Sequence, residues 1–453
     1  MYQTTRRTFI RQAACAALGT TGLISTIFDL RKINAAALPG DYKALVCLFL
    51  YGGNDANNVL IPTDTTSYNS YAAARGELAI PLNSILPITV QAGGGGHTFG
   101  FHPSMPELQN LFNQGKATMV ANVGTLVAPI TRVQYMSGSV GVPPQLFSHE
   151  DQAVQWQTSV PDRPGTKTGW GGRAGDLIQS LNGNTQVSLA LSIAGTNTFE
   201  FGNQVIPYLI SPDGSLGLNG FGSSTNSQIR LQGFKRLLAL PHSRLFEQAY
   251  ADTMTRSIAQ NEVLTAALSG IAPLATVFPD TYLGRQLNMV AKLIAARSNL
   301  NMRRQIFFCA VGGYDTHGDQ IESHTQLLIE LSQGMSAFYD ATVELGVEQS
   351  VATFTASDFG RTFGANGGGS DHGWGSHQFV MGGAVQGNRL YGTFPTLAID
   401  GPDDTEDGRW IPTTSVDEFS ATIAKWFGVA NSDLPMVFPN IGRFAHPDLG
   451  FLA

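Results

Sequence analysis

Apolar residues along the chain form three long runs that have the length of a β-strand. A strand that is buried on both faces shows a continuous apolar run rather than an alternation of apolar and polar positions. Each run stops at a short segment that carries an aspartate: Asp55, Asp315 and Asp358, respectively. The runs span residues 43–51, 305–311 and 350–356. The pattern predicts three buried strands of a parallel sheet.

Between these runs, apolar residues recur about every 3.6 positions, which is typical of helices that pack by one face. Residues 117–123 form a further strand-like run, and residues 185–220 predict a small β-rich insertion with a hairpin. The alternation predicts an α/β fold with a doubly wound, mainly parallel sheet and helices on both faces. The predicted helices cover residues 105–113, 148–158, 174–181, 243–269, 282–298, 320–346 and 416–427.

The N-terminus resembles a twin-arginine export signal. Arg6 and Arg7 precede Phe9, and a weakly apolar stretch too short and too polar to span a bilayer follows. An A-x-A cleavage site occurs at residues 35–37. We therefore predict a signal peptide at 1–37, a single α/β domain at 38–453, the twin-arginine export machinery as a partner, and a periplasmic or secreted location. A basic amphipathic N-terminus is the alternative.

Composition narrows the possible functions. The chain has 27 Lys and Arg against 34 Asp and Glu, a net charge of −7, so it lacks the basic excess that nucleic-acid binding requires. No run after residue 37 is long enough for a transmembrane segment.

Cys47 and Cys309 would remain after cleavage. They could pair in an oxidising compartment or stay as free thiols in buried strands.

Histidines and aspartates gather in two motifs. Asp315-Thr316-His317 follows one apolar run, and Asp371-His372 lies five residues before His377. The carboxyl ends of parallel strands meet at one sheet edge, and carboxylates buried together there need a cation. These residue types suit zinc, while manganese, magnesium and calcium are alternatives. The sequence therefore predicts a site for one or two divalent ions, whereas isolated Asp-x-His motifs would merely cap helices.

Six motifs in chain order carry a family resemblance. The sequence resembles the exported bacterial family labelled domain of unknown function fifteen-oh-one, which is related to the alkaline phosphatase and sulfatase superfamily. The resemblance implies an alkaline-phosphatase-like core with metals near the strand ends and a hydroxyl at a helix N-terminus that attacks phosphorus or sulfur. The motifs are GGNDANNVLIP at 52–62, FHPSMPEL at 101–108, SHEDQAVQW at 148–156, GGYDTHGDQ at 312–320, SDFGRTFGANGGGSDHGWGSH at 357–377 and IPTTSVDEFSATIAKWFGV at 411–429.

The resemblance also implies the metal ligands. The superfamily commonly has Asp-His-Gly where this chain has Asp358-Phe359-Gly360. Either the Asp371-His372 pair replaces the missing histidine from the adjacent loop, or only one ion binds. Arg361 would pair bidentately with an anionic substrate or would be structural. The implied metal ligands are Asp55, Asp315, His317 and Asp358, with His372 or His377 as the last.

Two serines are candidate nucleophiles. Ser148 opens a predicted helix whose positive end would stabilise an attacking alkoxide, but with Asp151 it also fits a capping box. Ser159 begins Ser159-x-Pro161-x-Arg163, the core of the sulfatase modification motif, although Lys167 departs from that motif.

The combined prediction is an exported metal-dependent hydrolase of phosphate or sulfate esters that acts on a small anionic ester. The alternative is a non-catalytic metal-binding or assembly protein that retains the fold. The chain has no P-loop, no G-x-S-x-G elbow and no H-E-x-x-H motif, which disfavours nucleotide-binding proteins, α/β-hydrolases and zincin proteases.

The signal assignment leads to a test. Changing Arg6 and Arg7 together to lysine should abolish export, because the apolar stretch after them is too weak to direct export by itself. Cell fractionation would measure the periplasmic share of the protein. A double variant that still reaches the periplasm and is cleaved near residue 37 would show that the assignment is wrong.

Overall fold

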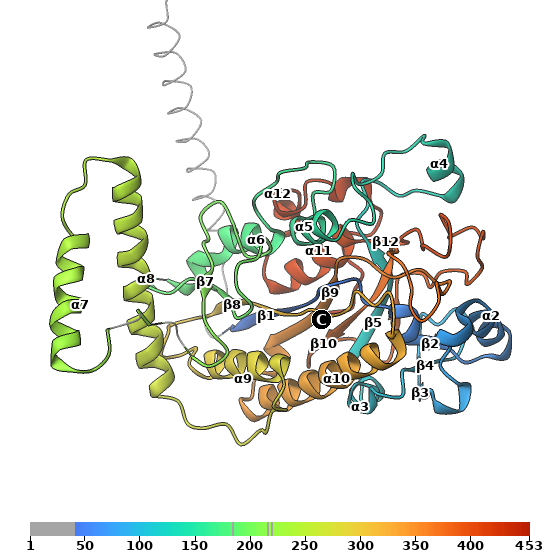
Figure 1. Ribbon diagram of the computed structural model, residues 1–453, viewed down its shortest axis with the longest axis horizontal. Helices are drawn as coiled ribbons and strands as arrows, with labels where there is room; N and C mark the ends of the chain where they lie inside the picture. The colour runs from blue at the N-terminus through green and yellow to red at the C-terminus, as the bar shows by residue number, and fades with distance from the viewer. Residues whose placement is uncertain (1–40, 184, 215–216, 219–220) are drawn as a thin grey trace, which may run out of the picture.

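The computed structural model describes residues 41–183, 185–214, 217–218 and 221–453 (Figure 1). The predicted signal at 1–37 lies outside these residues. In the described part of the chain, no helix combines the length and the hydropathy that a membrane crossing requires.

A nine-stranded sheet forms the centre of the molecule. The three predicted strands are neighbours in it, because β1 pairs in parallel with β8 on one side and with β9 on the other. β10 is antiparallel to both of its neighbours, so the sheet is mainly parallel, as predicted. The order is β11 (Leu390–Tyr391), β5 (Ala117–Gly124), β10 (Ser376–Met381), β9 (Val351–Ser357), β1 (Lys43–Leu50), β8 (Arg304–Val311), β6 (Ala190–Ser192) and β7 (Tyr208–Leu209), with β12 (Thr414–Ser415) beside β5.

Helices cover both faces of the sheet, which confirms the predicted α/β class (Figure 1). Successive residues of β1 alternate between two cores, with Leu48 in one and Phe49 in the other, which is why the strand reads as a continuous apolar run. One face carries α3 (Pro106–Asn113), α9 (Tyr282–Ala295) and α10 (Gln320–Glu344). The other carries α5 (His149–Thr158), α6 (Trp170–Ile178), α11 (Val416–Phe427) and α12 (Leu434–Val437).

The same alternation separates the two cysteines. In the parallel register Cys47 lies beside Phe308, and Cys309 lies beside Leu48. Cys47 belongs to the core on one face of the sheet and Cys309 to the core on the other. Both are buried free thiols, and side chains on opposite faces cannot form a disulfide.

The β-rich insertion expected at 185–220 takes another form. Its strands β6 and β7 pair in parallel and extend the main sheet, so the expected hairpin is wrong. A small antiparallel sheet occurs earlier in the chain, from β2 (Leu60–Pro62), β3 (Leu86–Ile88) and β4 (Phe99–Phe101). The short helices α2 (Thr65–Arg75) and α4 (Arg132–Ser137) were not predicted. The short strands were not predicted because two or three residues are too few to show an alternation of apolar and polar positions.

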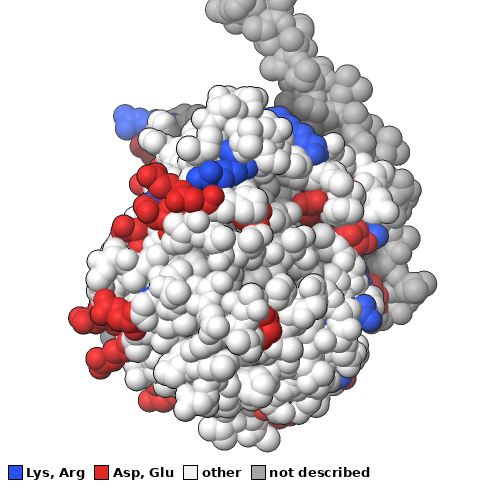
Figure 2. Space-filling model, turned by 90° about the vertical axis from the view of Figure 1, so that its right-hand side faces the viewer, with Lys and Arg blue, Asp and Glu red and all other residues white. Residues whose placement is uncertain are grey.

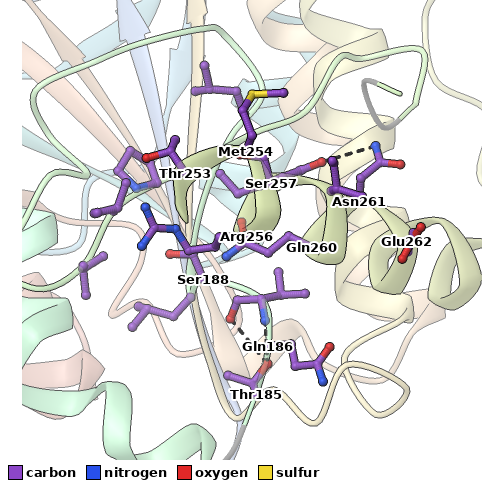
Figure 3. Close-up of a pocket in the computed structure, with 18 of the residues that line it drawn as sticks. Thr185, Gln186, Ser188, Thr253, Met254, Arg256, Ser257, Gln260, Asn261 and Glu262 are labelled. Carbon is purple, nitrogen blue, oxygen red and sulfur yellow. Dashed lines mark hydrogen bonds between the residues drawn. The ribbon is translucent and has the colours of Figure 1, made fainter. Parts of the chain in front are cut away.

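A helical hairpin of α7 (Thr225–Leu238) and α8 (Leu245–Ser269) projects from the β7 edge of the sheet (Figure 1). A cavity of about 710 Å³ separates α8 from this edge. Figure 3 shows Gln186 and Ser188 on one side of the cavity, with Ser257 and Gln260 of α8 on the other. Both apolar and polar side chains line this cavity, and beyond it α8 joins the main core through Leu264 and Ala267.

Burial of Glu200 generates a pH-dependent prediction. The side chain is fully buried, and burial raises its pKa to about 8. Between about pH 5 and pH 8 the unfolded chain releases this proton and the native chain keeps it, so the free energy of unfolding should fall by roughly 1.4 kcal/mol per pH unit from this group. Urea unfolding at several pH values should show that Glu200→Gln removes this contribution. The exposed-site control Glu262→Gln should keep the wild-type slope; equal slopes in all three proteins would contradict the prediction.

Candidate metal centre

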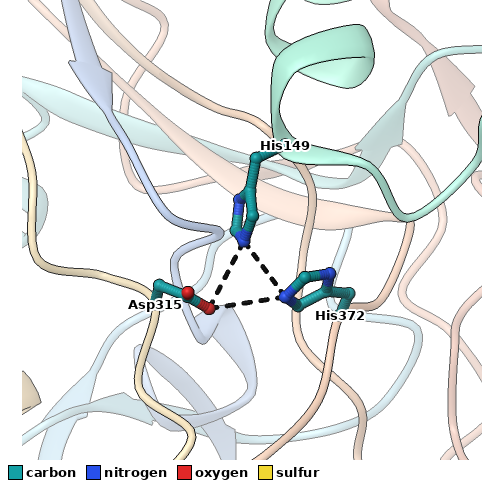
Figure 4. A group of neighbouring side chains, drawn as sticks. All are labelled: His149, Asp315 and His372. Atoms are coloured by element: carbon teal, nitrogen blue, oxygen red, sulfur yellow. Dashed lines mark hydrogen bonds and ion pairs between the residues drawn. The ribbon is translucent and has the colours of Figure 1, made fainter.

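Three side chains from distant segments meet at the carboxyl edge of the central strands (Figure 4). Asp315 follows β8, His372 lies in the loop between β9 and β10, and His149 is the first residue of α5. β1 ends at Leu50, level with the last residues of β8 and β9. The parallel register therefore brings the loops after all three strands to one place.

The spacing of the three ligand atoms suits one ion. They all lie within 4.8 Å of one another. Nε2 of His149 is 3.0 Å from Nε2 of His372, and each nitrogen is 3.4 Å from Oδ1 of Asp315. Ligand atoms about 2.0–2.1 Å from a tetrahedral zinc ion are about 3.3 Å apart. The observed separations match that value.

His317 brings a further nitrogen to the same group. Its Nε2 lies 2.9 Å from Oδ1 of Asp315 and 3.0 Å from Nε2 of His372. Of the sequence-predicted ligands, the structure thus brings together Asp315, His317 and His372.

The outer nitrogens of the three histidines all face acceptors. Nδ1 of His149 lies 2.7 Å from Oδ2 of Asp358, Nδ1 of His372 lies 2.7 Å from the carbonyl oxygen of Phe147, and Nδ1 of His317 lies 3.1 Å from Oδ1 of Asp371. A carbonyl or carboxylate oxygen requires the proton on Nδ1, which in a neutral ring leaves a lone pair on Nε2. Neutral Nε2 atoms 3.0 Å apart cannot hydrogen-bond to each other. A cation bound between them would satisfy these lone pairs.

Asp358 supports a histidine rather than joining the ligand atoms, which corrects its predicted position. Its side chain is buried, and Oδ2 accepts the backbone N–H of Gly52 at 2.9 Å as well as the His149 proton. This hydrogen bond raises the pKa of His149, against the effect of partial burial. Gly52 has φ +116, and a Cβ there would lie 2.3 Å from the backbone nitrogen of Asp315, so the loops meet only because this residue is glycine.

Phe359 forms an apolar wall beside the histidines. Its ring centroid lies 4.7 Å from that of His149 and 4.8 Å from that of His372. Burial lowers the pKa of His372, which favours its neutral, metal-binding form. Where the superfamily pattern has a histidine, this chain therefore has a phenylalanine that packs against two histidines from other segments.

Asp55 and His377 lie outside the cluster, contrary to expectation. Asp55 is buried in an ion pair with Arg75 and accepts a hydrogen bond from Gln320. His377 is buried, accepts the N–H of Asn122 at Nδ1 and stacks on another ring. Arg75 ends α2, a helix that the sequence analysis missed, so the counterion of Asp55 was not foreseen.

Arg361 does not face an open site. Its side chain has no exposed area, and it donates to Oδ1 of Asp315 at 2.8 Å and to the carbonyl of Gly52 at 3.0 Å. Further donors contact Ser370. Partial burial would raise the pKa of Asp315, but the Arg361 guanidinium holds it below its usual value. Of the two roles expected for Arg361, the contacts therefore fit the structural one: it orients the carboxylate of Asp315.

The two candidate nucleophiles lie at opposite ends of α5. Ser148 is the N-cap residue beside His149, and its hydroxyl donates to Oδ2 of Asp151 at 2.6 Å instead of accepting a backbone N–H. Ser159 is the C-cap residue and is fully buried. The ten residues of α5 between them make eleven residue steps, which place Ser159 roughly 16 Å from Ser148. Only Ser148 lies beside the metal centre.

His149 was missed as a candidate metal ligand, although it lies inside the quoted motif at 148–156. The available signal was a histidine at the first position of a helix that follows a predicted strand. The centre it completes is partly open to solvent. The exposed fractions of the side chains are 33% for His149, 46% for Asp315 and 26% for His372. Metal sites that act catalytically keep such an accessible position.

Comparison with known proteins identifies a family match over most of the chain. Residues 42–440 match the family described as "Protein of unknown function (DUF1501)". No curated protein matches the sequence.

Similar solved structures include three of low sequence identity. The PsFucS1 sulfatase from Pseudoalteromonas sp. is 9% identical, with 91% of this chain and 72% of that chain covered and a TM-score of 0.37. The C-terminal periplasmic domain of EcEptC from Escherichia coli, in complex with Zn, is 11% identical, with 92% and 93% covered and a TM-score of 0.34. A protein in the alkaline phosphatase superfamily from Vibrio parahaemolyticus is 12% identical, with 93% and 79% covered and a TM-score of 0.33.

The different positions of Asp358 and Asp55 give a paired prediction. Asp358→Asn should lower zinc affinity by about 10- to 100-fold, because it removes the charge that holds the His149 ring and its tautomer. Asp55→Asn should leave zinc affinity unchanged while lowering the free energy of unfolding by about 3–5 kcal/mol, because it leaves Arg75 buried without a counterion. Competition with a chelating indicator measures the affinity, and urea unfolding measures the stability. Equal zinc affinities in the two variants would contradict this reading of the site.

Proposed function

The chain belongs to the family described as protein of unknown function DUF1501, and we propose that it is a metal-dependent hydrolase of phosphate or sulfate esters. The observation that carries the proposal is the convergence of His149, Asp315 and His372 at a solvent-accessible point, with ligand atoms spaced for one ion. We further propose that the protein is exported by the twin-arginine route and acts in the periplasm or outside the cell.

The donor set fits zinc best. Two imidazoles with one carboxylate are a common ligand set of catalytic zinc, while manganese, magnesium and calcium prefer more oxygen ligands. His317 supplies a third imidazole beside the group. A bound divalent ion would polarise an ester oxygen and lower the pKa of a bound water to near 7.

The residues around the ligands give the site a fixed geometry. Asp358 holds the His149 ring, and Arg361 holds the Asp315 carboxylate. Phe359 excludes water from one side of the two histidine rings. Rigid ligands with hydrogen-bonded outer atoms are what a catalytic metal site requires, since a small displacement lowers the rate strongly.

The attacking group is either a water on the ion or the Ser148 hydroxyl. Ser148 stands at the N-terminus of α5, where backbone N–H groups and the helix dipole favour an anionic ester oxygen. If Ser148 attacks, Asp151 would accept the hydroxyl proton while the serine oxygen bonds to phosphorus or sulfur and the bond to the leaving alcohol breaks; water would then hydrolyse the seryl ester. A phosphate or sulfate ester, which carries negative charge next to the scissile bond, suits this combination of cation and helix N-terminus.

A non-catalytic metal-binding protein is the second candidate. The observation that favours it is the burial of Arg361, whose donors all contact protein atoms and so cannot bind an anionic ester. Such a protein would bind the ion at the same residues without hydrolysing an ester.

Elemental analysis together with rate measurements distinguishes the two candidates. The purified protein should hold one equivalent of a divalent metal and hydrolyse an aryl phosphate or an aryl sulfate. His149→Ala should lose both properties, with a fall in rate of about a thousandfold or more. The matched control His97→Ala removes an exposed histidine that contacts Asp64 and should change neither. One equivalent of metal without hydrolysis of either ester would support the second candidate, and absence of bound metal would refute both.

Variants of Ser148 identify the attacking group. If the serine attacks, Ser148→Ala and Ser148→Asn should both abolish hydrolysis while metal content is unchanged, because neither side chain has a hydroxyl. Asn is a good N-cap, so thermal stability should be kept in Ser148→Asn. Wild-type activity in Ser148→Asn would assign the attack to a metal-bound water.

A further inference from the structure

Large apolar side chains are exposed where α7 turns into α8. We define the hairpin tip as residues 235–250, which comprise the last residues of α7, the turn and the first residues of α8. The surface of a soluble protein normally carries single exposed apolar residues, whereas several of them close together indicate a binding surface. The exposed fractions are 61% for Leu237, 54% for Leu240, 80% for Leu245, 87% for Phe246 and 60% for Tyr250.

These side chains are not the ones that hold the hairpin together. A separate small core between the two helices contains Leu238, Ala251 and Ile258, with Phe234 and Met254 packed against it. The hairpin therefore has an inner apolar core that joins its helices, and the exposed apolar side chains at the tip do not belong to that core. Packing between α7 and α8 therefore does not explain why the exposed side chains at the tip are apolar.

The tip is also locally basic. The tip, residues 235–250, contains Lys235, Arg236 and Arg244 and one acidic residue, Glu247, in a chain whose net charge is −7. Lys235 pairs with Glu262, and Arg244 contacts Glu247 while 81% of its side chain is exposed. Figure 2 shows the opposite end of the molecule, where acidic side chains gather along one margin and Lys and Arg are few. Apolar and basic residues thus coincide at the tip.

The position of the tip allows it to reach an extended surface. In Figure 1 the hairpin lies beside the sheet at the left of the view, and its turn is far from the loops of the metal centre. The cavity beneath α8 separates the hairpin from the edge of the sheet. A flat surface can therefore contact the turn without contacting the metal centre.

We propose that the hairpin tip docks on an anionic phospholipid surface. Leu245 and Phe246 would enter the boundary between headgroups and acyl chains, while Arg236 and Arg244 would meet the lipid phosphates. Exposed Leu and Phe combined with Lys or Arg are the features of segments that lie in the membrane interface. Self-association through this surface is disfavoured, because two basic tips would repel each other. The proposal does not depend on the proposed hydrolase activity.

Co-sedimentation with vesicles tests the proposal. The purified protein should bind vesicles of phosphatidylcholine that contain phosphatidylglycerol and should not bind phosphatidylcholine alone. Leu245→Ser with Phe246→Ser should lower the partition coefficient by about tenfold or more, since both side chains are almost fully exposed and leave no cavity when shortened. Arg236→Gln with Arg244→Gln should lower it by a similar factor, and added salt should weaken binding of the wild type.

Two controls separate membrane docking from other causes. Val277→Ser changes a side chain that is also 87% exposed but lies beyond the end of α8, and it should bind like wild type. His149→Ala should also bind like wild type, so a failure of the metal centre does not affect the result. Absence of binding to the anionic vesicles, or an equal loss in Val277→Ser, would overturn the proposal. A wild-type dimer that the Leu245→Ser/Phe246→Ser variant dissociates would assign the tip to contact with a second copy instead.

Discussion

The hydrogen bond between His149 and Asp358 is the contact on which the geometry of the metal centre depends. It joins the start of α5 to the end of β9, two segments 209 positions apart in the chain. Asp358 also accepts the N–H of Gly52, so one buried carboxylate ties a helix and the loop after β1 to the end of β9. Because the acceptor fixes the proton on Nδ1 of His149, Nε2 faces the other ligands. Asp358, which would not itself contact an ion, thereby determines that Nε2 is the atom of His149 that would bind one.

Much of the central fold was predictable because its strands are covered on both sides. β1, β8 and β9 are buried over almost their whole length, and burial on both faces requires the continuous apolar runs from which they were predicted. Strands β6 and β7 have only two or three residues, so no period identifies them or their partners. The sequence therefore predicts the centre of the sheet better than its edge.

The site was predictable only in part, because a pattern along the chain does not show which atom a carboxylate contacts. Asp315 and Asp358 were both expected among the ligands, yet Asp315 supplies an atom to the cluster, whereas Asp358 contacts the outer nitrogen of His149. Asp55 looked equivalent to both, but a helix absent from the sequence prediction supplies its counterion, Arg75. The sequence left Arg361 open between a substrate contact and a structural role, because its burial depends on contacts with Ser370 in the long loop that folds back over it.

The antiparallel direction of β10 has a consequence for how the protein would acquire an ion. The loop between β9 and β10 leaves and returns at the same edge of the sheet, and it brings His372 to a histidine 223 positions earlier in the chain. Contacts of such long range form only when the strands between them have assembled. The unfolded chain does not hold these ligands together, so an ion would bind the native state more tightly and would stabilise it by mass action. A tightly bound ion would then indicate that the whole sheet has formed.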